Sequence, residues 1–317
     1  MGTGYGMLGH VGHMFQNSFG AYLTSSLQYT PITKETLALG IEQKEDPGMR
    51  GRIGSNPVYQ GFHKIEGGVT MMANPIDIGV PLKSVVGLIS TTSDTGIQTH
   101  VFRPRQADKD DKSPTDLLTF EVDRDVGSSG LYYDCAGNTL QIAITNGELV
   151  EFQLGVIGAG FHRMTPSNPV YQEATPFKWD QASFSYNGWW IEDILSLTVN
   201  VNNNLEAKYT MINTKAPSRI KRTQQPTIEM QGTMLFTQHS LWQAFENHLQ
   251  APLALHFAGA ETPNALTLYF PKILFTEYKQ NIGGMGLIEV SFSARTCWDT
   301  TSNYEFEATL VNTQTYY

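Results

Sequence analysis

Residues 64–73 read KIEGGVTMMA, and residues 227–237 read TIEMQGTMLFT. In both stretches apolar residues fall on alternate positions, which puts them on one face of an extended strand. Similar runs, rich in β-branched and aromatic residues and bounded by Gly, Pro, Asn and Asp, recur along the 317 residues. The sequence therefore predicts a mainly β protein, built as two domains or one large all-β unit.

The same reading locates the other elements. In the first half the predicted strands are residues 37–42, 64–73, 99–103, 116–123, 138–145 and 149–156. In the second half they are residues 191–202, 227–237, 253–257, 265–270, 273–278, 287–294 and 304–310. A short helix is predicted at 80–88, with Pro81 in its first turn. A second helix begins at the possible cap Ser240, because Leu241, Trp242, Phe245 and Leu249 recur at helical spacing.

Both halves therefore follow the order two strands, a helix and four strands, with one extra strand in the second half. LALGIEQ from Leu37 parallels LSLTVNV from Leu195, IEGGVTMM from Ile65 parallels EMQGTMLF from Glu229, and TNGELVEFQLG from Thr145 parallels IGGMGLIEVSF from Ile282. An internal duplication is the favoured interpretation, and chance similarity between β-rich segments is the alternative. The expected division is an N-terminal arm (1–36), a first β domain (37–158), a connector (159–190), a second β domain (191–312) and a C-terminal tail (313–317).

Composition excludes several classes of protein. No window approaches the roughly 18 unbroken apolar residues of a membrane helix. The formal net charge of -9 opposes general nucleic-acid binding. Charged residues make up only 16% of the chain, which suits extensive contact with other protein surfaces. Cys135 and Cys297 form no disulfide framework, which favours a reduced, cytosolic folding history, and the N-terminus lacks the pattern of a secretory signal.

Two long loops occupy equivalent places in the two halves, residues 44–62 and 206–226. Loops of this length are usually functional or disordered, and plain solvent-exposed insertions are the alternative. Their basic residues stand out in an acidic chain and could meet acidic surface on a neighbouring copy: Arg50, Arg52, Arg219, Lys221 and Arg222.

Several segments of the chain resemble a known protein family. PITKETLAL from Pro31, the Gly/Arg-containing loop after it, and GGVTMMANPIDIGVPLKSVVGL from Gly67 resemble the tail tube (major tail) proteins of long-tailed bacteriophages. ILSLTVNVNNNLE from Ile194, EMQGTMLFT from Glu229, SLWQAFENHL from Ser240 and LTLYFPKILFTEY from Leu266 resemble the same family. The resemblance spans about residues 2–312. It rests on the order of strands and helices and on the positions of Gly and Pro between them.

The resemblance implies β-sandwich tube domains, each with one short helix, packed into rings that stack into a hollow tube. The expected partners are further copies of the chain, the tape-measure protein, tail-terminator or distal-tail proteins, and double-stranded DNA that passes without tight binding. Because single-domain relatives are about half as long, a duplicated chain favours three copies per ring, with six possible. The implied location is the virion tail, assembled in the host cytoplasm and without membrane contact.

Chemical motifs are weak. His10 and His13 form an HxxH without a nearby third ligand, and Asp108, Asp110 and Asp111 lack the glycine and glutamate of an EF-hand. GVIGAG from Gly155 lacks the GxGxxG order. We therefore expect no catalytic, cofactor or metal site. The alternatives are a carbohydrate-binding β-sandwich module or hydrolase, and a related distal-tail or tail-terminator component.

Overall fold

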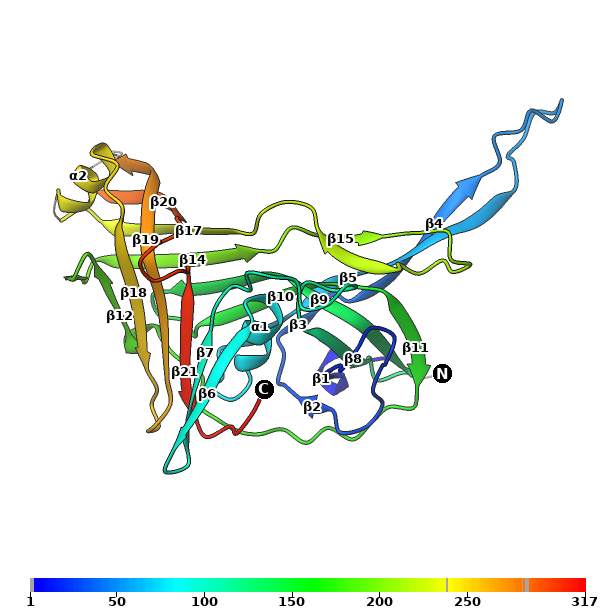
Figure 1. Ribbon diagram of the computed structural model, residues 1–317, viewed down its shortest axis with the longest axis horizontal. Helices are drawn as coiled ribbons and strands as arrows, with labels where there is room; N and C mark the ends of the chain where they lie inside the picture. The colour runs from blue at the N-terminus through cyan, green and yellow to red at the C-terminus, as the bar shows by residue number, and fades with distance from the viewer. Residues whose placement is uncertain (1–2, 238, 281, 283–284) are drawn as a thin grey trace.

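The computed structural model describes residues 3–237, 239–280, 282 and 285–317. Its centre is an antiparallel sheet that runs through both halves of the chain (Figure 1). The first half supplies β4 (Ala38–Glu45), β5 (Val58–Met72), β10 (Glu151–Gly158) and β9 (Ser129–Thr145), in that order. The second half continues with β14 (Ile194–Asn202), β17 (Thr227–Leu235), β20 (Glu289–Thr296) and β19 (Ala265–Gln280). The two halves meet in the ladder between β9 and β14.

A second layer begins where β9 and β19 leave this central sheet. The first part of β9 pairs with β8 (Leu117–Asp123) and β11 (Gly160–Met164), and the first part of β19 pairs with β18 (Ala251–Ala258) and β21 (Glu307–Asn312). Short strands extend this layer: β1 (His10–Phe15), β2 (Gln28–Tyr29), β6 (Leu88–Asp94), β7 (Ile97–Phe102), β12 (Ala182–Tyr186) and β13 (Trp189–Ile191). The expectation of a mainly β, sandwich-like fold is confirmed.

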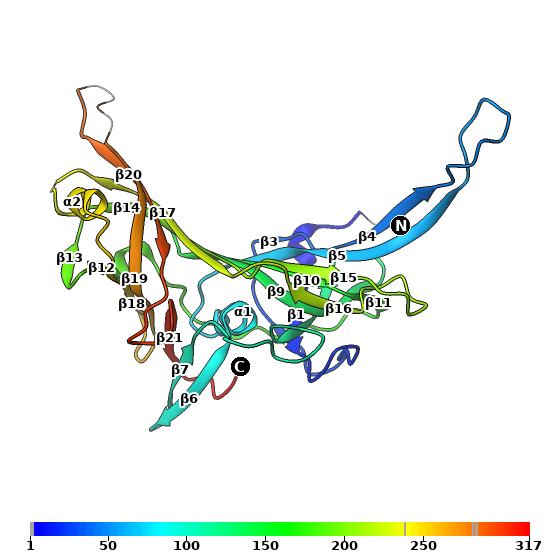
Figure 2. The same cartoon turned by 45° about the horizontal axis from the view of Figure 1, so that its top comes forward.

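Each half contains one short α-helix, as the sequence predicts. Helix α1 (Gly79–Val85) packs against β9, and α2 (Ser240–Glu246) packs against β19 (Figures 1 and 2). Ser240 is the first helical residue of α2 instead of its cap, which is His239. The helices and the second layer cover one face of the central sheet, where a single large apolar cluster lies.

Two predicted strands of the second half are one strand. Residues 265–270 and 273–278 both belong to β19, so the extra strand expected there does not exist. In the sequence, Pro271 divides the predicted run, because proline cannot donate to a ladder. In the structure it lies where the register between β18 and β19 shifts, between the pairs Leu253–Phe270 and Ala251–Ile273. A β-bulge tolerates proline there, so the strand continues.

Strands enter and leave both long loops, so each loop is the end of a hairpin. In residues 44–62, β4 ends at Glu45 and β5 begins at Val58, and residues 46–57 between them lie outside strands. In residues 206–226, β15 (Leu205–Lys208) pairs with β16 (Arg219–Arg222). The strand signal was missed because most residues of β4 and the first part of β5 are exposed on both faces, so no apolar alternation marks them.

The arm and the connector both contribute strands to the sheets. Within residues 1–36, β1 pairs with β8, so the N-terminal segment is clamped to the second layer. Within residues 159–190, β12 pairs with β18 in the corresponding place, and the buried ring of Phe177 lies 5.9 Å from that of Phe257. The pairing thus groups β1 with the first half and β12 with the second.

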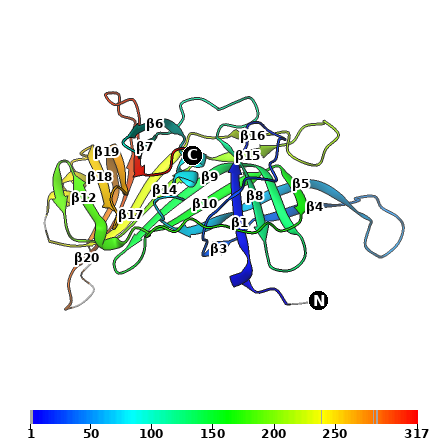
Figure 3. The same ribbon diagram turned by 90° about the horizontal axis from the view of Figure 1, so that it is seen from below.

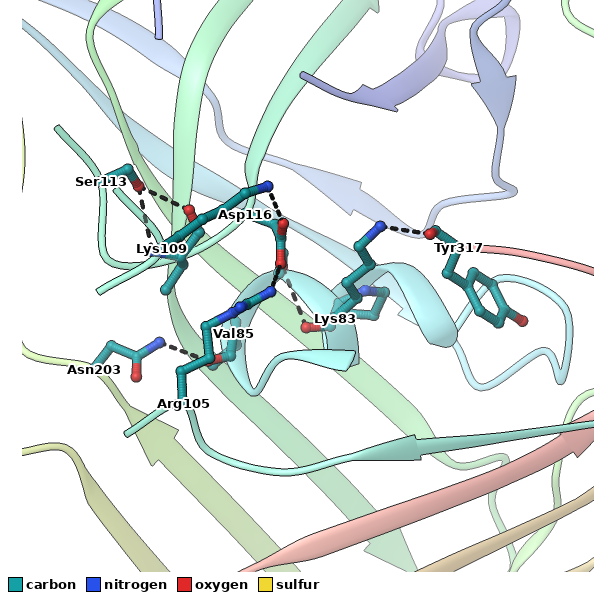
Figure 4. A network of polar contacts seen from close by, with 11 residues as sticks. Lys83, Val85, Arg105, Lys109, Ser113, Asp116, Asn203 and Tyr317 are labelled. Atoms are coloured by element: carbon teal, nitrogen blue, oxygen red, sulfur yellow. Dashed lines mark hydrogen bonds and ion pairs between the residues drawn. The ribbon is translucent and has the colours of Figure 1, made fainter. Parts of the chain in front are cut away.

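A buried polar network fixes α1 to the rest of the molecule (Figure 4). The amide of Asn203, on the segment between β14 and β15, donates to the carbonyls of Val85 and Gly137 at 2.8 and 3.0 Å. Nearby, the buried Asp116 carboxylate forms ion pairs with Arg105 and Lys109. These cations hold the pKa of Asp116 below its usual value against the opposing effect of burial. The network joins the second half of the chain to the helix of the first.

Asp77, in the turn before α1, predicts a pH effect on stability. Burial raises the pKa of its carboxyl to about 6, although Thr30 donates a hydrogen bond to it. The folded state therefore binds this proton more tightly than the unfolded state, and the free energy of unfolding falls as pH rises from about 4 to about 6. Asp77→Asn is expected to remove this slope and to stabilise the protein by about 2 kcal/mol at pH 7. Urea unfolding at pH 4 and pH 7 measures both effects, and an unchanged slope would contradict the assignment.

Candidate functional site

The central sheet has one polar face that the helices do not cover. Directly paired residues place uncharged polar side chains across it: Gln153 on β10, Gln141 on β9, Asn200 and Thr198 on β14, Gln231 on β17 and Ser293 on β20. All of these are exposed or half-buried, whereas the residues between them, such as Leu140, Val199 and Met230, are buried. The alternation that the sequence predicted thus separates a core face from a broad polar face.

The charges on this polar face are mixed, with acidic residues in excess. The acidic side chains are Glu42, Glu66, Glu151, Glu229, Glu277 and Glu289; the basic ones are Lys44, Lys64, Lys279 and Arg295. Several of the basic groups are paired locally, as in the ion pairs Lys64–Glu66 and Lys279–Glu277. Over the residues that the structure describes, this face offers no basic groove of the kind that grips a nucleic acid.

The central sheet ends in two strand edges that lie toward opposite ends of the long axis (Figure 1). Among the described residues, β4 pairs only with β5. The other edge belongs to the last residues of β19. These residues pair with β20 on one side, and on the other side β18 ends at the pair Ala251–Ile273, so the described residues include no further partner there. Exposed strand edges carry unpaired N–H and C=O groups that readily accept another strand.

The β4–β5 hairpin projects from the body as an arm (Figures 1 and 3). Its tip carries Met49 and Ile53, whose side chains are fully exposed at 102% and 109%. Arg50 and Arg52 lie at the same tip: Arg50 pairs with Asp46, and Arg52 donates to the Ser55 carbonyl at 3.4 Å. Exposed apolar side chains beside charged ones can form a contact surface with another protein.

The other predicted basic residues lie elsewhere, on β16. Lys221 contacts Asp108 at 2.9 Å, and Arg219 lies 3.9 Å from Asp111. Arg222 donates to the Arg105 carbonyl at 3.3 Å, and burial lowers its pKa. The structure therefore does not bring the five residues together. The acidic hairpin tip at 108–111 already neutralises part of the β16 cluster, a contact that the sequence did not reveal.

Aromatic residues of β13 and of the C-terminal segment divide into two groups. Trp189 and Trp190 on β13, and Tyr316, are 78%, 67% and 68% exposed. Tyr317 instead packs within its own chain: its hydroxyl donates to the Ile76 carbonyl at 2.6 Å, and its ring fills the space that a side chain at Gly79 would need. Tyr317 is thus a structural residue of the α1 region.

The weak chemical motifs are packed into the fold. His10 and His13 lie buried on β1, and burial lowers the pKa of His13 to about 4. Over the described ranges, no group of three or more His, Cys, Asp or Glu side chains could hold a metal ion. Cys135 and Cys297 are free thiols. In the part of the chain that the structure describes, no helix is long and apolar enough to cross a membrane.

The fold and these surfaces define a β-sheet structural protein whose exposed features are edges, arms and a broad polar face. The family model described as phage tail tube protein matches residues 8–296, and the chain belongs to that family. A search of curated proteins finds no match. Membership makes the chain a structural component of a phage tail that associates with itself into a tube. The family resemblance seen in the sequence is confirmed.

Proposed function

We propose that copies of this chain close into rings, that the rings stack into the tail tube, and that the tube is the conduit for DNA ejection. The observation that carries this proposal is the central sheet: among the described residues it has two open edges toward opposite ends of the molecule and, between them, one polar face that the helices do not cover. A contact between unlike edges is heterologous, and such contacts close into rings when the rotation permits. The polar face then lines the lumen.

A ring of three chains is preferred over six, because the two halves provide equivalent sheet segments. The order β4–β5–β10–β9 with α1 corresponds to β14–β17–β20–β19 with α2. A Cβ at Gly67 would lie 2.3 Å from the Thr36 carbonyl oxygen, and one at Gly232 would lie 2.6 Å from that of Ser196. Both glycines thus permit the same close approach of a preceding segment, which supports the duplication.

The two glycines also change which residues of the first half correspond to which residues of the second half. Aligning Gly67 with Gly232 puts the buried Ile65 beside the buried Met230, whereas the sequence parallel puts it beside the exposed Glu229. On these strands the proposed alignment therefore differs by one residue from the alignment suggested by the sequence. Superposition of the halves in an experimental ring tests the duplication, and a rotation near 60° between them is expected for six domains in one ring.

Electron microscopy of the purified chain tests the proposed function. We expect rings and hollow tubes in negative stain, with threefold symmetry in averaged end views. Monomers at high protein concentration, under conditions where the chain is folded, would contradict self-assembly. Sixfold symmetry with one chain per unit would agree with tube formation but refute the proposal of three chains per ring. The carbohydrate-binding alternative predicts monomers that bind glycans instead.

Assembled tubes are expected not to retain double-stranded DNA at physiological salt. The reason is the acidic excess of the polar face together with the net charge of -9 on every chain. A filter-retention assay measures this. Glu151→Lys with Glu229→Lys provides the matched comparison, because it makes the same face basic and is expected to create retention that falls steeply with added salt. Micromolar, salt-dependent retention by the unmodified tube would contradict the prediction.

Basic and apolar residues of the two hairpins are proposed contacts between rings. Arg50 and Arg52 on the arm, with Met49 and Ile53, are the stronger part of this proposal because they are exposed. Arg219, Lys221 and Arg222 remain candidates, although their neighbours in the same chain already satisfy much of their charge. Tape-measure, terminator and distal-tail proteins are the further proposed partners, at the lumen and at the two ends of the tube.

A further inference from the structure

We infer that Met49 and Met211 form a modification site for peroxide, and that their oxidation to methionine sulfoxide stops the stacking of rings. The site acts within the proposed contact between rings, so the inference rests on that proposed function. It adds a chemical control of assembly that the oxidation state of two side chains sets.

The methionine side chains include two extremes of exposure. Met71, Met230 and Met234 are buried in the large apolar cluster. Four others in the described chain are almost completely exposed: Met7 at 88%, Met49 at 102%, Met211 at 105% and Met285 at 109%. Methionine is usually a buried residue, because its long apolar side chain gains by leaving water. Core packing therefore explains the first group but not the second.

Each exposed methionine lies outside the strands and close in sequence to an exposed leucine or isoleucine. The pairs are Met7 with Leu8, Met49 with Ile53, Met211 with Ile212, and Met285 with Leu287. A flexible thioether beside an aliphatic side chain adapts its shape to many partner surfaces. These segments are therefore suited to contact with another protein surface.

Met49 and Met211 occupy equivalent places in the two halves under the proposed duplication. Met49 lies between β4 and β5, and Met211 lies between β15 and β16, within the segment that joins β14 to β17. The pair β4–β5 of the first half corresponds to the pair β14–β17 of the second. Both equivalent segments thus carry an exposed methionine together with an exposed isoleucine.

The two hairpins also contact each other near their bases. The ring of Phe62 on β5 stacks on that of Tyr209 with centroids 4.2 Å apart, and the Tyr209 hydroxyl donates to the His63 carbonyl at 2.9 Å. The backbone N–H of His63 donates to the Lys215 carbonyl at 2.9 Å. Both hairpins extend toward the same end of the molecule (Figures 1 and 3). A change of polarity at both methionines therefore affects one end of the molecule.

Hydrogen peroxide is the oxidant, and the exposed thioether is its substrate. A lone pair of the sulfur attacks one peroxide oxygen, so the S–O bond forms as the O–O bond breaks. The proton on the transferred oxygen passes to the leaving hydroxide, which becomes water. The sulfur is oxidised by two electrons and the peroxide is reduced. The product carries a polar S=O group where the thioether was apolar.

Oxidation at Met49 and Met211 is expected to spare the fold and to weaken the contact. Both side chains are fully exposed in the single chain, so their sulfoxides stay in water there. In a contact between rings the sulfoxide oxygen would leave water without a hydrogen-bond partner, which is unfavourable. Because every chain of the tube carries the same change, stacking is expected to be lost while single rings remain.

Leucine variants test which methionines control stacking, because leucine keeps a similar apolar volume and has no thioether. The variant is Met49→Leu with Met211→Leu, and the matched control is Met7→Leu with Met285→Leu, at two positions of similar exposure. Each chain is divided into an untreated and a peroxide-treated portion, and the yields of long tubes are compared. Treatment is expected to lower the yield at least about tenfold for the wild-type chain and the control, and less than about twofold for the variant.

Enzymatic reduction tests the same site without any substitution. Methionine sulfoxide reductase with a dithiol reductant returns the sulfoxides to thioethers, and the treated wild-type chain is then expected to form long tubes again. Equal losses in the two leucine variants, or no recovery after complete reduction, would overturn the site while leaving tube formation by the untreated chain intact. Absence of tubes from the untreated wild-type chain would instead refute the proposed function.

Mass spectrometry of the methionine peptides gives a readout that does not depend on tube yield. In the folded single chain, Met49 and Met211 are expected to be oxidised at least about tenfold faster than the buried Met230 and Met234. The oxidised chain is expected to unfold in urea as the untreated chain does. In assembled tubes, oxidation of Met49 and Met211 is expected to slow at least about tenfold, because the neighbouring ring covers them. Equal rates in tubes and single chains would overturn their place in the contact.

Discussion

Deletion of residues 48–56 is expected to abolish long tubes while leaving a folded chain. The deletion removes Met49, Ile53, Arg50 and Arg52 from the tip of the β4–β5 arm, where they make little contact with the rest of their own chain. Shortening a surface loop costs little, so the free energy of unfolding is expected to change by less than about 1 kcal/mol. Tube length in negative stain and unfolding in urea measure the two effects.

Point variants make the same test without shortening the chain. Met49→Asp with Ile53→Asp puts charge at two fully exposed positions, so it cannot disturb the core. Long tubes are expected to be lost and single rings retained, because the arm is proposed to act between rings. Val170→Asp is the matched control, since Val170 is 78% exposed in the connector and away from the arm. Long tubes from either the deletion or the double variant would contradict the role of the arm.

Gly67→Ala is expected to lower the free energy of unfolding by about 3 kcal/mol or more. Gly67 has a φ of +138°, and a Cβ there would lie 2.3 Å from the Thr36 carbonyl oxygen and 2.7 Å from the Leu37 Cα. These neighbours are backbone atoms, so the segment that leads into β4 would have to move away from the sheet. Urea unfolding monitored by tryptophan fluorescence measures the loss.

Gly96→Ala separates the close contact from the cost of the dihedral angle. Gly96 also has a positive φ, +87°, but no atom lies within 4 Å of the position of its Cβ. Its substitution is expected to cost only about 1–2 kcal/mol. Similar losses at both glycines would show that the approach of Thr36 to Gly67 does not matter for stability.

Strands with one buried face could be predicted well from the sequence. Residues 64–73, 227–237 and 138–145 each contain apolar residues at every second position, and all three lie in the central sheet. The exposed ends of β4 and β5 could not, because a strand that buries neither face has no hydrophobic period. Pro271 misled for another reason: it lies at a bulge in β19, and that bulge is defined by the register with β18, which no local pattern predicts.

The candidate site was predictable only in part. The basic residues of the long loops are conspicuous in an acidic sequence, yet their partners are not: Asp108 lies opposite Lys221 through folding alone. The edges of β4 and β19 carried no signal in the sequence. An edge is defined by which strands pair, and pairing between residues far apart in the chain leaves no local pattern.

The sequence by itself determined the β class, the two helices, the family and the acidic surface, because periodicity, composition and motif order are local or summed properties. Only the tertiary structure decided that one sheet passes through both halves, that the N-terminal segment and the connector add strands to the second layer, and that two edges of the sheet are open among the described residues. The physical reason is that a β-strand satisfies its backbone hydrogen bonds with a partner that can lie anywhere in the chain. The identity of that partner is fixed by packing against the whole core.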